Sequence, residues 1–345
     1  MSLRDEIFQQ AEVLQELLKT EWSHVLEITD EIRKREIKYI FLAARGTSDN
    51  AGLYVKYTLG INNAIPVALA APSMFSIYHS PPNLKNSLVL SISQSGQSPD
   101  IVEVVEEGKR QGAMTLALTN KPDSPLAVAS DHVINVQAGE EKAVAATKSY
   151  TAQLFSAAML SASLSENEVM YHDLQRVPEF VSQVLTLETL VNQIVERFYY
   201  MEQCVVIGRG YNYATAFEWA LKMKEMTYLV AEAYSSADFL HGPIAMTEMG
   251  FPVFMVAPSG QVYPALLHLA KRLQEEKKVN LLILSDQDKI LEYSAAPVRL
   301  PAGLPEWISP IVSIVPAQLF CLALAKLRGL DTENPRGLSK VTLTT

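Results

Sequence analysis

Short apolar segments alternate with longer amphipathic segments along the chain. Between residues 38 and 140, apolar runs are followed by polar residues and, in most cases, by apolar positions at helical spacing. Near-continuous apolar strands that alternate with helices are typical of a parallel sheet covered by helices on both faces. The pattern therefore predicts an α/β fold. The runs read "KYIFLAA", "IPVALAA", "NSLVLSIS", "AMTLALTN" and "HVINVQAG".

The same pattern restarts near residue 200, and its landmarks repeat at a nearly constant distance. This distance is too long for a stacked repeat array and indicates a duplication. The paired landmarks are Arg45 and Arg209, Phe75 and Phe239, and Ser95 and Ser259, each 164 residues apart, and Asn120 and Asp286, 166 apart.

The duplication predicts two tandem, doubly wound (flavodoxin-like) α/β subdomains with parallel sheets. Apolar positions at helical spacing before the first strand predict an N-terminal helix. The expected organisation is a helical segment at 1–34, a first subdomain at 35–190, and a second subdomain at 191–345 that includes a C-terminal tail.

Composition narrows the classes of function. The 345 residues carry a formal net charge of −9, so no basic stripe is present to bind nucleic acid. The two cysteines, Cys204 and Cys321, lie in apolar runs, which predicts buried thiols in a reducing cytoplasm. The N-terminus lacks a signal-peptide core, and no apolar run reaches the length of about 18 residues that spans a bilayer. We therefore expect neither a nucleic-acid nor a membrane partner.

Hydroxyl side chains gather where two of the predicted strands end. "RGTS" and "SQSGQS" each lie between a strand and a helix. Helix N-termini offer free N–H groups and a partial positive charge, so serine and threonine hydroxyls there can complete an anion site without a lysine. Neither a P-loop nor a GxGxxG fingerprint is present, which favours a monophosphate over a nucleotide. The alternative is that these residues only cap helices.

Several motifs carry a resemblance to a known family. The motifs "ARGTSDNAG", "SISQSGQSPD", "GEEKAVAATKSYTAQ", "KMKEMTYLVAEAYSSADFLHGP" and "NPRGLSKVT" resemble the sugar isomerase (SIS) domains. The similarity is closest to the isomerase half of glucosamine-fructose-6-phosphate aminotransferase and its stand-alone deaminase relatives, and runs from about residue 35 to the C-terminus. The resemblance implies that the phosphate and part of the sugar are held by Thr47, Ser48, Ser93, Gln94, Ser95, Ser98 and Val144. Position 98 is usually threonine in the aminotransferase, and position 146, usually serine there, is alanine here.

Candidate residues for the chemistry lie in the second half. Lys222 and Glu225 are three residues apart on one predicted helix, which is also the spacing of an ordinary solvated ion pair. His241 precedes a Gly-Pro turn, and Lys340 stands near the C-terminus, where a lysine is usually exposed. The resemblance assigns Glu225 the proton transfer between sugar C1 and C2, with Lys222 tuning its charge. It also assigns ring opening to His241, from the neighbouring subunit of a homodimer, and contact with the open-chain sugar to Lys340.

Together these observations lead us to expect a sugar-phosphate deaminase that converts glucosamine-6-phosphate to fructose-6-phosphate and ammonia without metal or redox cofactor. The chain lacks the N-terminal cysteine of a glutaminase domain. The tail ends "KVTLTT" rather than with the aminotransferase's acidic terminus, which favours the deaminase relatives. The alternatives are an ammonia-dependent synthase, a plain isomerase or a fructosamine-phosphate deglycase on the same scaffold, and a non-catalytic sugar-phosphate sensor.

Overall fold

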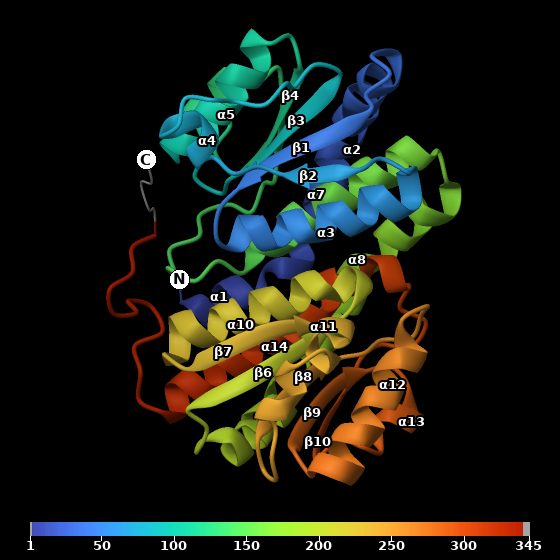
Figure 1. The fold of residues 1–345 in the computed structure, drawn as a ribbon, viewed down its shortest axis with the longest axis vertical. Helices are drawn as coiled ribbons and strands as arrows, with labels where there is room; N and C mark the ends of the chain where they lie inside the picture. Colours follow the sequence, from blue (N-terminus) through green and yellow to red (C-terminus); the bar gives the residue numbers. More distant parts are fainter. Residues whose placement is uncertain (1, 341–345) are drawn as a thin grey trace. The chain divides into compact units, whose positions relative to one another are not determined.

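Every strand of the computed structural model, which describes residues 2–340, pairs in parallel with its neighbours. The chain divides into two compact units, each with one five-stranded sheet, and each unit is described by itself (Figure 1). Unit A contains residues 12–141, 146–176 and the tail from Ser339. Unit B contains the chain up to Ala11, residues 142–145, and residues 177–338.

Unit A has the strand order β2-β1-β3-β4-β5, in which the chain reverses its direction of winding between β1 and β3. Strands β3 and β4 are buried throughout, which explains their unbroken apolar sequences. The strands are β1 (Tyr39–Ala44), β2 (Val67–Leu69), β3 (Ser87–Ile92), β4 (Met114–Thr119) and β5 (His132–Asn135). The helices are α2 (Gln10–Lys34), α3 (Thr47–Asn63), α4 (Ser73–Ser76), α5 (Pro99–Arg110), α6 (Pro125–Ala129), α7 (Lys148–Ser165) and α8 (Glu168–Leu185), of which α2 and α8 continue across the unit boundary.

Alternate residues of the strands in unit A serve opposite faces of the sheet. Phe41 and Val89 pack with Val104 of α5, whereas Leu42 points to the other face and approaches Gly52 of α3. Figure 1 shows α4 and α5 on one face of this sheet and α3 with α7 on the other. Both faces are therefore covered, as the sequence pattern predicts.

Unit B repeats the connectivity of unit A, with the order β10-β9-β8-β6-β7. In each unit the second strand lies outside the first, and the third to fifth follow on its other side, so the predicted tandem flavodoxin-like fold is confirmed. The strands are β6 (Gln203–Gly208), β7 (Val230–Ser235), β8 (Pro252–Val256), β9 (Asn280–Ser285) and β10 (Ala296–Arg299). The α-helices are α1 (Leu3–Phe8), α9 (Glu188–Ile194), α10 (Tyr213–Thr227), α11 (Ser236–Leu240), α12 (Tyr263–Arg272), α13 (Asp288–Leu291) and α14 (Ser309–Leu327). Short 3-10 segments are η1 (Val195–Phe198), η2 (Gly210–Asn212), η3 (Pro243–Met246) and η5 (Glu306–Ile308), and η4 (Leu273–Lys277) is a π-helical turn.

The expected N-terminal helix is present as two segments, with a break at Gln9. Helix α1 starts at a capping box in which the side chains of Ser2 and Asp5 each bond the other residue's backbone N–H. Its residues Leu3 and Ile7 are fully buried in unit B, whereas α2 continues as a separate helix from Gln10. The charged sequence hides this break because no proline or glycine marks it.

Helix α14 corrects one expectation from the sequence. Together with η5 it forms a stretch of 22 residues, Glu306–Leu327, with a mean hydropathy of 2.0 in its 18-residue window, long and apolar enough to cross a bilayer. That window is entirely buried inside the structure. The sequence shows no uninterrupted apolar run of this length because polar residues interrupt it, among them Ser309, Ser313 and Gln318. The helix is therefore a core helix of unit B.

An aromatic cluster joins α14 and α10 to the sheet of unit B. The ring of Phe254 on β8 lies 5.0 Å from that of Trp219, 5.0 Å from that of Phe198 and 5.1 Å from that of Phe320. Its neighbours in the strand, Val253 and Met255, belong to the opposite core against α12. Phe254 thus contacts two helices on this face of the sheet.

Replacing Phe254 by alanine removes the ring at the centre of this cluster. We expect Phe254→Ala to lower the free energy of unfolding of unit B by about 3–5 kcal/mol, because the rigid neighbours leave a cavity. Met249→Ala, at a position 75% exposed, is the matched control and should change it by less than about 0.5 kcal/mol. Urea unfolding followed by tryptophan fluorescence measures both, and equal stability of the two variants would contradict the assignment.

Candidate active site

The two hydroxyl-bearing loops lie side by side at the carboxyl edge of the sheet of unit A. Strands β1 and β3 are neighbours with Ala44 opposite Ile92, so the loops that follow them leave from adjacent positions. The chain changes its winding direction between these two strands, and open α/β sheets bind ligands at such a point. Thr47, Ser48, Ser93, Gln94, Ser95 and Ser98 all belong to these two loops and the first turns that follow.

Gly96 gives the second loop its shape. Its φ of +61° lies in the left-handed region, and a Cβ at this position would come within 2.0 Å of the Ser124 hydroxyl oxygen. Its carbonyl accepts a hydrogen bond from Leu126 N–H at 3.1 Å, which ties the loop to α6. A larger residue would therefore displace the loop from the start of α6.

An ion pair links the two loops. The Arg45 guanidinium donates to one oxygen of Asp100 from Nη2 at 2.7 Å and from Nε at 2.9 Å, and the Asp100 side chain is fully buried in the first turn of α5. The only basic residue of "ARGTSDN" is therefore engaged within the protein. An anion at this edge would meet hydroxyl and N–H groups first.

The hydroxyls of the second loop retain the capacity to donate. Ser93 Oγ accepts from Gly96 N–H at 3.1 Å, and Ser95 Oγ accepts from Gln97 N–H at 3.3 Å, so each keeps its own proton. Ser98 occupies the N-cap position of α5 but forms no side-chain cap hydrogen bond with the described residues. Capping therefore does not account for Ser98.

The first loop presents its residues differently. Ser48 is buried, and its hydroxyl accepts from Gln153 Nε2 of α7 at 3.1 Å. Gly46 has a φ of +55°, and Thr47 begins α3 directly after it. The start of α3 thus lies beside that of α5, with Ser48 oriented by a neighbouring helix.

The equivalent loop of unit B is closed from within. Ser259 donates from its N–H and its hydroxyl to Asp286, at 2.6 Å and 2.7 Å, and Gln261 N–H donates to Glu306 Oε2 at 2.8 Å. A Cβ at Gly260 would come within 2.2 Å of the Glu306 carboxyl carbon. Internal carboxylates thus use the donors that an external anion would need.

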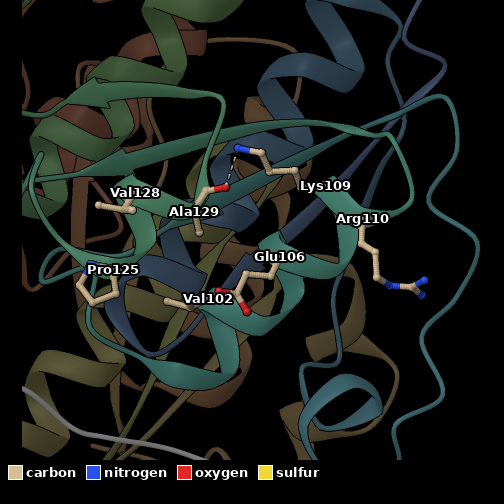
Figure 2. A pocket seen from close by; sticks show the side chains of 7 residues that line it. All are labelled: Val102, Glu106, Lys109, Arg110, Pro125, Val128 and Ala129. Atoms are coloured by element: carbon tan, nitrogen blue, oxygen red, sulfur yellow. Dashed lines mark hydrogen bonds between the residues drawn. The ribbon is translucent and has the colours of Figure 1, made fainter.

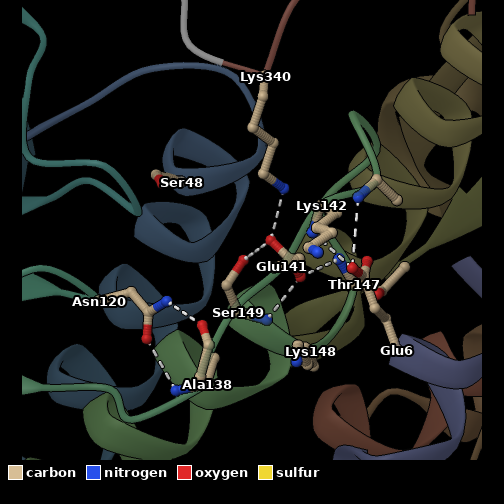
Figure 3. Close-up of polar contacts among 12 residues, drawn as sticks. Glu6, Ser48, Asn120, Ala138, Glu141, Lys142, Thr147, Lys148, Ser149 and Lys340 are labelled. Carbon is tan, nitrogen blue, oxygen red and sulfur yellow. Dashed lines mark hydrogen bonds and ion pairs between the residues drawn. The ribbon is translucent and has the colours of Figure 1, made fainter. Parts of the chain in front are cut away.

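The counterpart of Asp286 in unit A is neutral. Asn120 accepts from Ala138 N–H at 2.8 Å and donates to the carbonyl of Gly139 at 2.7 Å (Figure 3). This position therefore supports the strand-end segment before Glu141 and adds no negative charge to the loop. The difference favours unit A as the anion-binding half.

The predicted acid–base pair in unit B is part of a larger group on α10. The Lys222 ammonium, 2% exposed, donates to Glu225 Oε2 at 2.5 Å and lies 3.2 Å from Glu218 Oε1. Burial would lower the pKa of Lys222, but the charges of Glu218 and Glu225 outweigh it and hold this pKa above its usual value. Glu225 remains 23% exposed, so a buried lysine orients a carboxylate that other molecules can reach.

His241 lies on the surface of unit B at the end of α11. Its backbone N–H bonds the Asp238 carbonyl at 3.1 Å, and its side chain is exposed. Val144 belongs to the segment 142–145 of unit B, where Glu6 of α1 accepts from Lys142 and Ala143 N–H groups. Lys222, Glu225, His241 and Val144 thus belong to unit B.

Lys340 belongs with the residues of unit A. Its ammonium donates to Glu141 Oε2 at 2.7 Å, and Glu141 is completely buried (Figure 3). Burial would raise the pKa of Glu141, but the charge of Lys340 and hydrogen bonds from Lys340, Ser149 and Thr147 hold this pKa below its usual value. The predicted site residues therefore fall into two groups, one in each unit.

The sequence patterns did not identify two carboxylates of these groups. Glu218 lies four residues before Lys222 on the same helix, so helical spacing alone could have found it. Glu141 stands within "GEEKAVAATK", but its partner Lys340 is 199 residues away, and no local pattern signals such a contact.

Other features of the structure do not add to the candidate site. A cavity of about 590 Å³ lies between α5 and α6 of unit A and contains none of the predicted site residues (Figure 2). Within residues 2–340, no three His, Cys, Asp or Glu side chains are grouped to hold a metal ion. Both cysteines are buried and free, as predicted, and burial raises the pKa of Cys204 to about 12. The cavity is lined by Val102, Glu106, Lys109, Arg110, Pro125, Val128 and Ala129.

Comparison with known sequences relates both repeats to one family. A sequence profile of the SIS domain matches residues 35–163 and 198–328. The isomerizing glutamine–fructose-6-phosphate aminotransferase of Mycobacterium tuberculosis (strain H37Rv) is 33% identical over 320 residues, which is 89% of this chain and 51% of that protein. That of Thermus thermophilus is 32% identical over 97% of this chain and 57% of that protein. The chain thus spans about half the length of the curated relatives it matches.

Solved structures agree with this relationship. The C-terminal domain of glucosamine-fructose-6-phosphate aminotransferase from Francisella tularensis is 28% identical with a TM-score of 0.88, over 96% of this chain and 98% of that one. A protein from Silicibacter pomeroyi DSS-3, provisionally described as a phosphosugar isomerase, is 31% identical with a TM-score of 0.86, over 96% and 100%. Glucosamine-6-phosphate deaminase from Thermotoga maritima shares the fold at 23% identity, with a TM-score of 0.77 over the full length of both chains. Because the SIS profile matches well over half of the chain, in two repeats, this protein belongs to the SIS domain family.

Proposed function

We propose that this SIS-domain protein is an aldose–ketose isomerase that acts as a deaminase on an amino-sugar phosphate. The proposed reaction converts glucosamine-6-phosphate and water to fructose-6-phosphate and ammonia. The observation that carries the proposal is Glu225, a partly exposed carboxylate fixed by a buried lysine. Such a carboxylate is suited to move one proton between two adjacent carbon atoms.

The loops after β1 and β3 bind the phosphate. The hydroxyls of Ser93, Ser95 and Ser98 donate to its oxygens, together with N–H groups at the starts of α3 and α5. Support comes from the adjacency of the two loops and from the absence of a carboxylate at Asn120. Thr47, Ser48, Gln94 and the backbone of Val144 complete the contacts to the substrate.

The chemical steps follow from ring opening. His241 moves a proton from the anomeric hydroxyl to the ring oxygen, which yields the open-chain aldehyde. Glu225 then takes the proton from C2 and returns it to C1, while O1 gains a proton and the amine nitrogen loses one, so that the C1 aldehyde becomes an alcohol and the C2 amine becomes an imine. Water adds to C2, and ammonia leaves as the ketone forms. Lys222 keeps Glu225 oriented, and Lys340 binds the open-chain sugar.

The relatives support this substrate class. The matched proteins are named for fructose-6-phosphate aminotransfer with isomerisation, and one solved relative is named as a glucosamine-6-phosphate deaminase. A second candidate is a phosphosugar isomerase without ammonia release, which the similarity to the whole solved chain of the Silicibacter pomeroyi protein favours. The two buried, unpaired thiols are consistent with a reducing compartment such as the cytoplasm.

Turnover of a substrate panel tests the proposal directly. Ammonia release is measured with glucosamine-6-phosphate and galactosamine-6-phosphate, and isomerisation with glucose-6-phosphate. Glu225→Gln keeps the shape of the side chain but loses the base, so kcat should fall by on the order of 10²–10⁴ while KM changes little. The exposed Glu202→Gln serves as the matched control and should keep wild-type activity. Wild-type protein that turns over no sugar phosphate would exclude the proposed reaction.

A mixing experiment tests whether His241 acts in the neighbouring subunit. Inactive His241→Asn and Glu225→Gln chains are unfolded together and refolded at equal concentration. If each site takes His241 from a second copy, mixed dimers contain one intact site, and about a quarter of the wild-type activity should return. If His241 and Glu225 serve a site within one chain, no intact site can form and activity stays absent.

Substitution of Gly96 tests the phosphate loop. Gly96→Ala forces a left-handed residue and a Cβ against Ser124, so we expect sugar-phosphate affinity to fall about tenfold or more. Gly60→Ala on α3 is the matched control, because a Cβ there meets nothing within 4 Å. Isothermal titration calorimetry gives both affinities. A folded Gly96→Ala protein with unchanged affinity would contradict the proposal that this loop binds the phosphate.

A further inference from the structure

Glu141 is a fully buried carboxylate whose two oxygens have different partners. Oε1 accepts from the backbone N–H groups of Thr147 and Ser149, at 3.0 Å and 3.1 Å. Oε2 accepts from Ser149 Oγ at 2.7 Å and from Lys340 Nζ at 2.7 Å. One oxygen thus faces the start of α7, and the other is shared between that helix and the C-terminal tail.

The contacts to α7 fix the carboxylate independently of the tail. Thr147 is the N-cap residue of this helix and forms no side-chain cap hydrogen bond with the described residues, so Glu141 supplies the cap from six residues upstream. A negative charge is also favoured at the N-terminus of a helix. Glu141 is therefore a rigid, charged acceptor before the tail is considered.

Capping alone does not explain how Glu141 is used. The backbone N–H groups require only Oε1, and a neutral side chain could serve them. Oε2 receives the Lys340 ammonium, whose side chain is 23% exposed against 0% for Glu141. A charge-assisted hydrogen bond to a buried carboxylate is stronger than an exposed ion pair, so this contact is suited to hold a chain segment.

We propose that Glu141 anchors the C-terminal tail to unit A by binding Lys340, and thereby sets the position of this lysine. Glu141 is a positioning residue. It acts on the substrate only through Lys340, and this consequence for catalysis rests on the proposed function. In the anchored state the Lys340 nitrogen is a charged hydrogen-bond donor. Any role other than hydrogen-bond donation requires this nitrogen to leave Glu141.

Tail anchoring can be measured without a substrate. Hydrogen–deuterium exchange is followed in peptides containing residues 337–340, beyond Arg336, whose backbone N–H is held separately by the Tyr228 hydroxyl. Glu141→Gln keeps an acceptor for the helix but loses the charge, and Lys340→Met removes the tail's cation without touching the helix. Each should speed exchange in these peptides about tenfold or more. The exposed neighbour Glu140 provides the matched control, and Glu140→Gln should leave exchange unchanged.

The double variant separates anchoring from a general loss of stability. If Glu141 acts through Lys340, Glu141→Gln adds no further exchange in the Lys340→Met protein. If the effects add, the two residues act separately and the proposal is wrong. If Glu141→Gln fails to fold, the Lys340→Met variant still tests the proposal. Unchanged exchange of the tail peptides in that variant would show that Glu141 does not anchor the tail through Lys340.

Kinetics with glucosamine-6-phosphate then test the catalytic consequence. Both single variants should lower kcat about tenfold or more, with a smaller change in KM, because the lysine contacts the open-chain form. The exchange data stand apart from this result. If the wild-type protein turns over no sugar phosphate, the proposed function fails while faster exchange still supports the anchor; unchanged exchange overturns the anchor whatever the activity.

Discussion

The N–H groups left unpaired where a strand ends and a helix begins are the constraint to which the strand-end loops of both units respond. The structure satisfies them in different ways. Glu141 caps α7, and Asp286 and Glu306 close the loop before α12. In the loop before α5 the acceptors of the Gly96 and Gln97 N–H groups are serine hydroxyls, which remain able to donate. Parallel strands bring such helix starts to one edge of each sheet, and in the loop before α12 carboxylates of the chain itself occupy the donors that an anion would need.

The fold was predictable from the sequence because a parallel strand that is buried on both faces has a nearly continuous apolar sequence. The duplication was predictable because glycines and serines at strand ends kept their spacing. Helix α14 was not recognised as one long apolar element, since its polar residues interrupt the run. In the structure two of these residues are buried with partners: Ser309 accepts from Asn212, and Gln318 accepts from Gln10. Hydropathy along the chain does not reveal a partner supplied by a distant segment.

The residues of the candidate site also differ in whether the sequence alone reveals them. Hydroxyls at strand ends and the Lys222–Glu225 pair could be found because their spacing is local, and Glu218 obeys the same helical rule. Glu141 could not be identified from the sequence, since its role depends on a contact with Lys340 at the other end of the chain. The closure of the second loop was equally hidden. Its loss of Ser and Gln is visible in "APSG", but only the structure shows two carboxylates in the place of an anion.

Helix α14 has a consequence for how this protein fails. Its 22-residue stretch is as apolar as a bilayer-spanning segment, and its 18-residue window is fully buried inside the structure. Any change that opens this core uncovers a long hydrophobic surface in one step. A partly unfolded molecule would then associate with others before it could refold. At high protein concentration, loss of stability in unit B should therefore be seen as aggregation and declining yield, whereas dilute protein in urea can unfold reversibly.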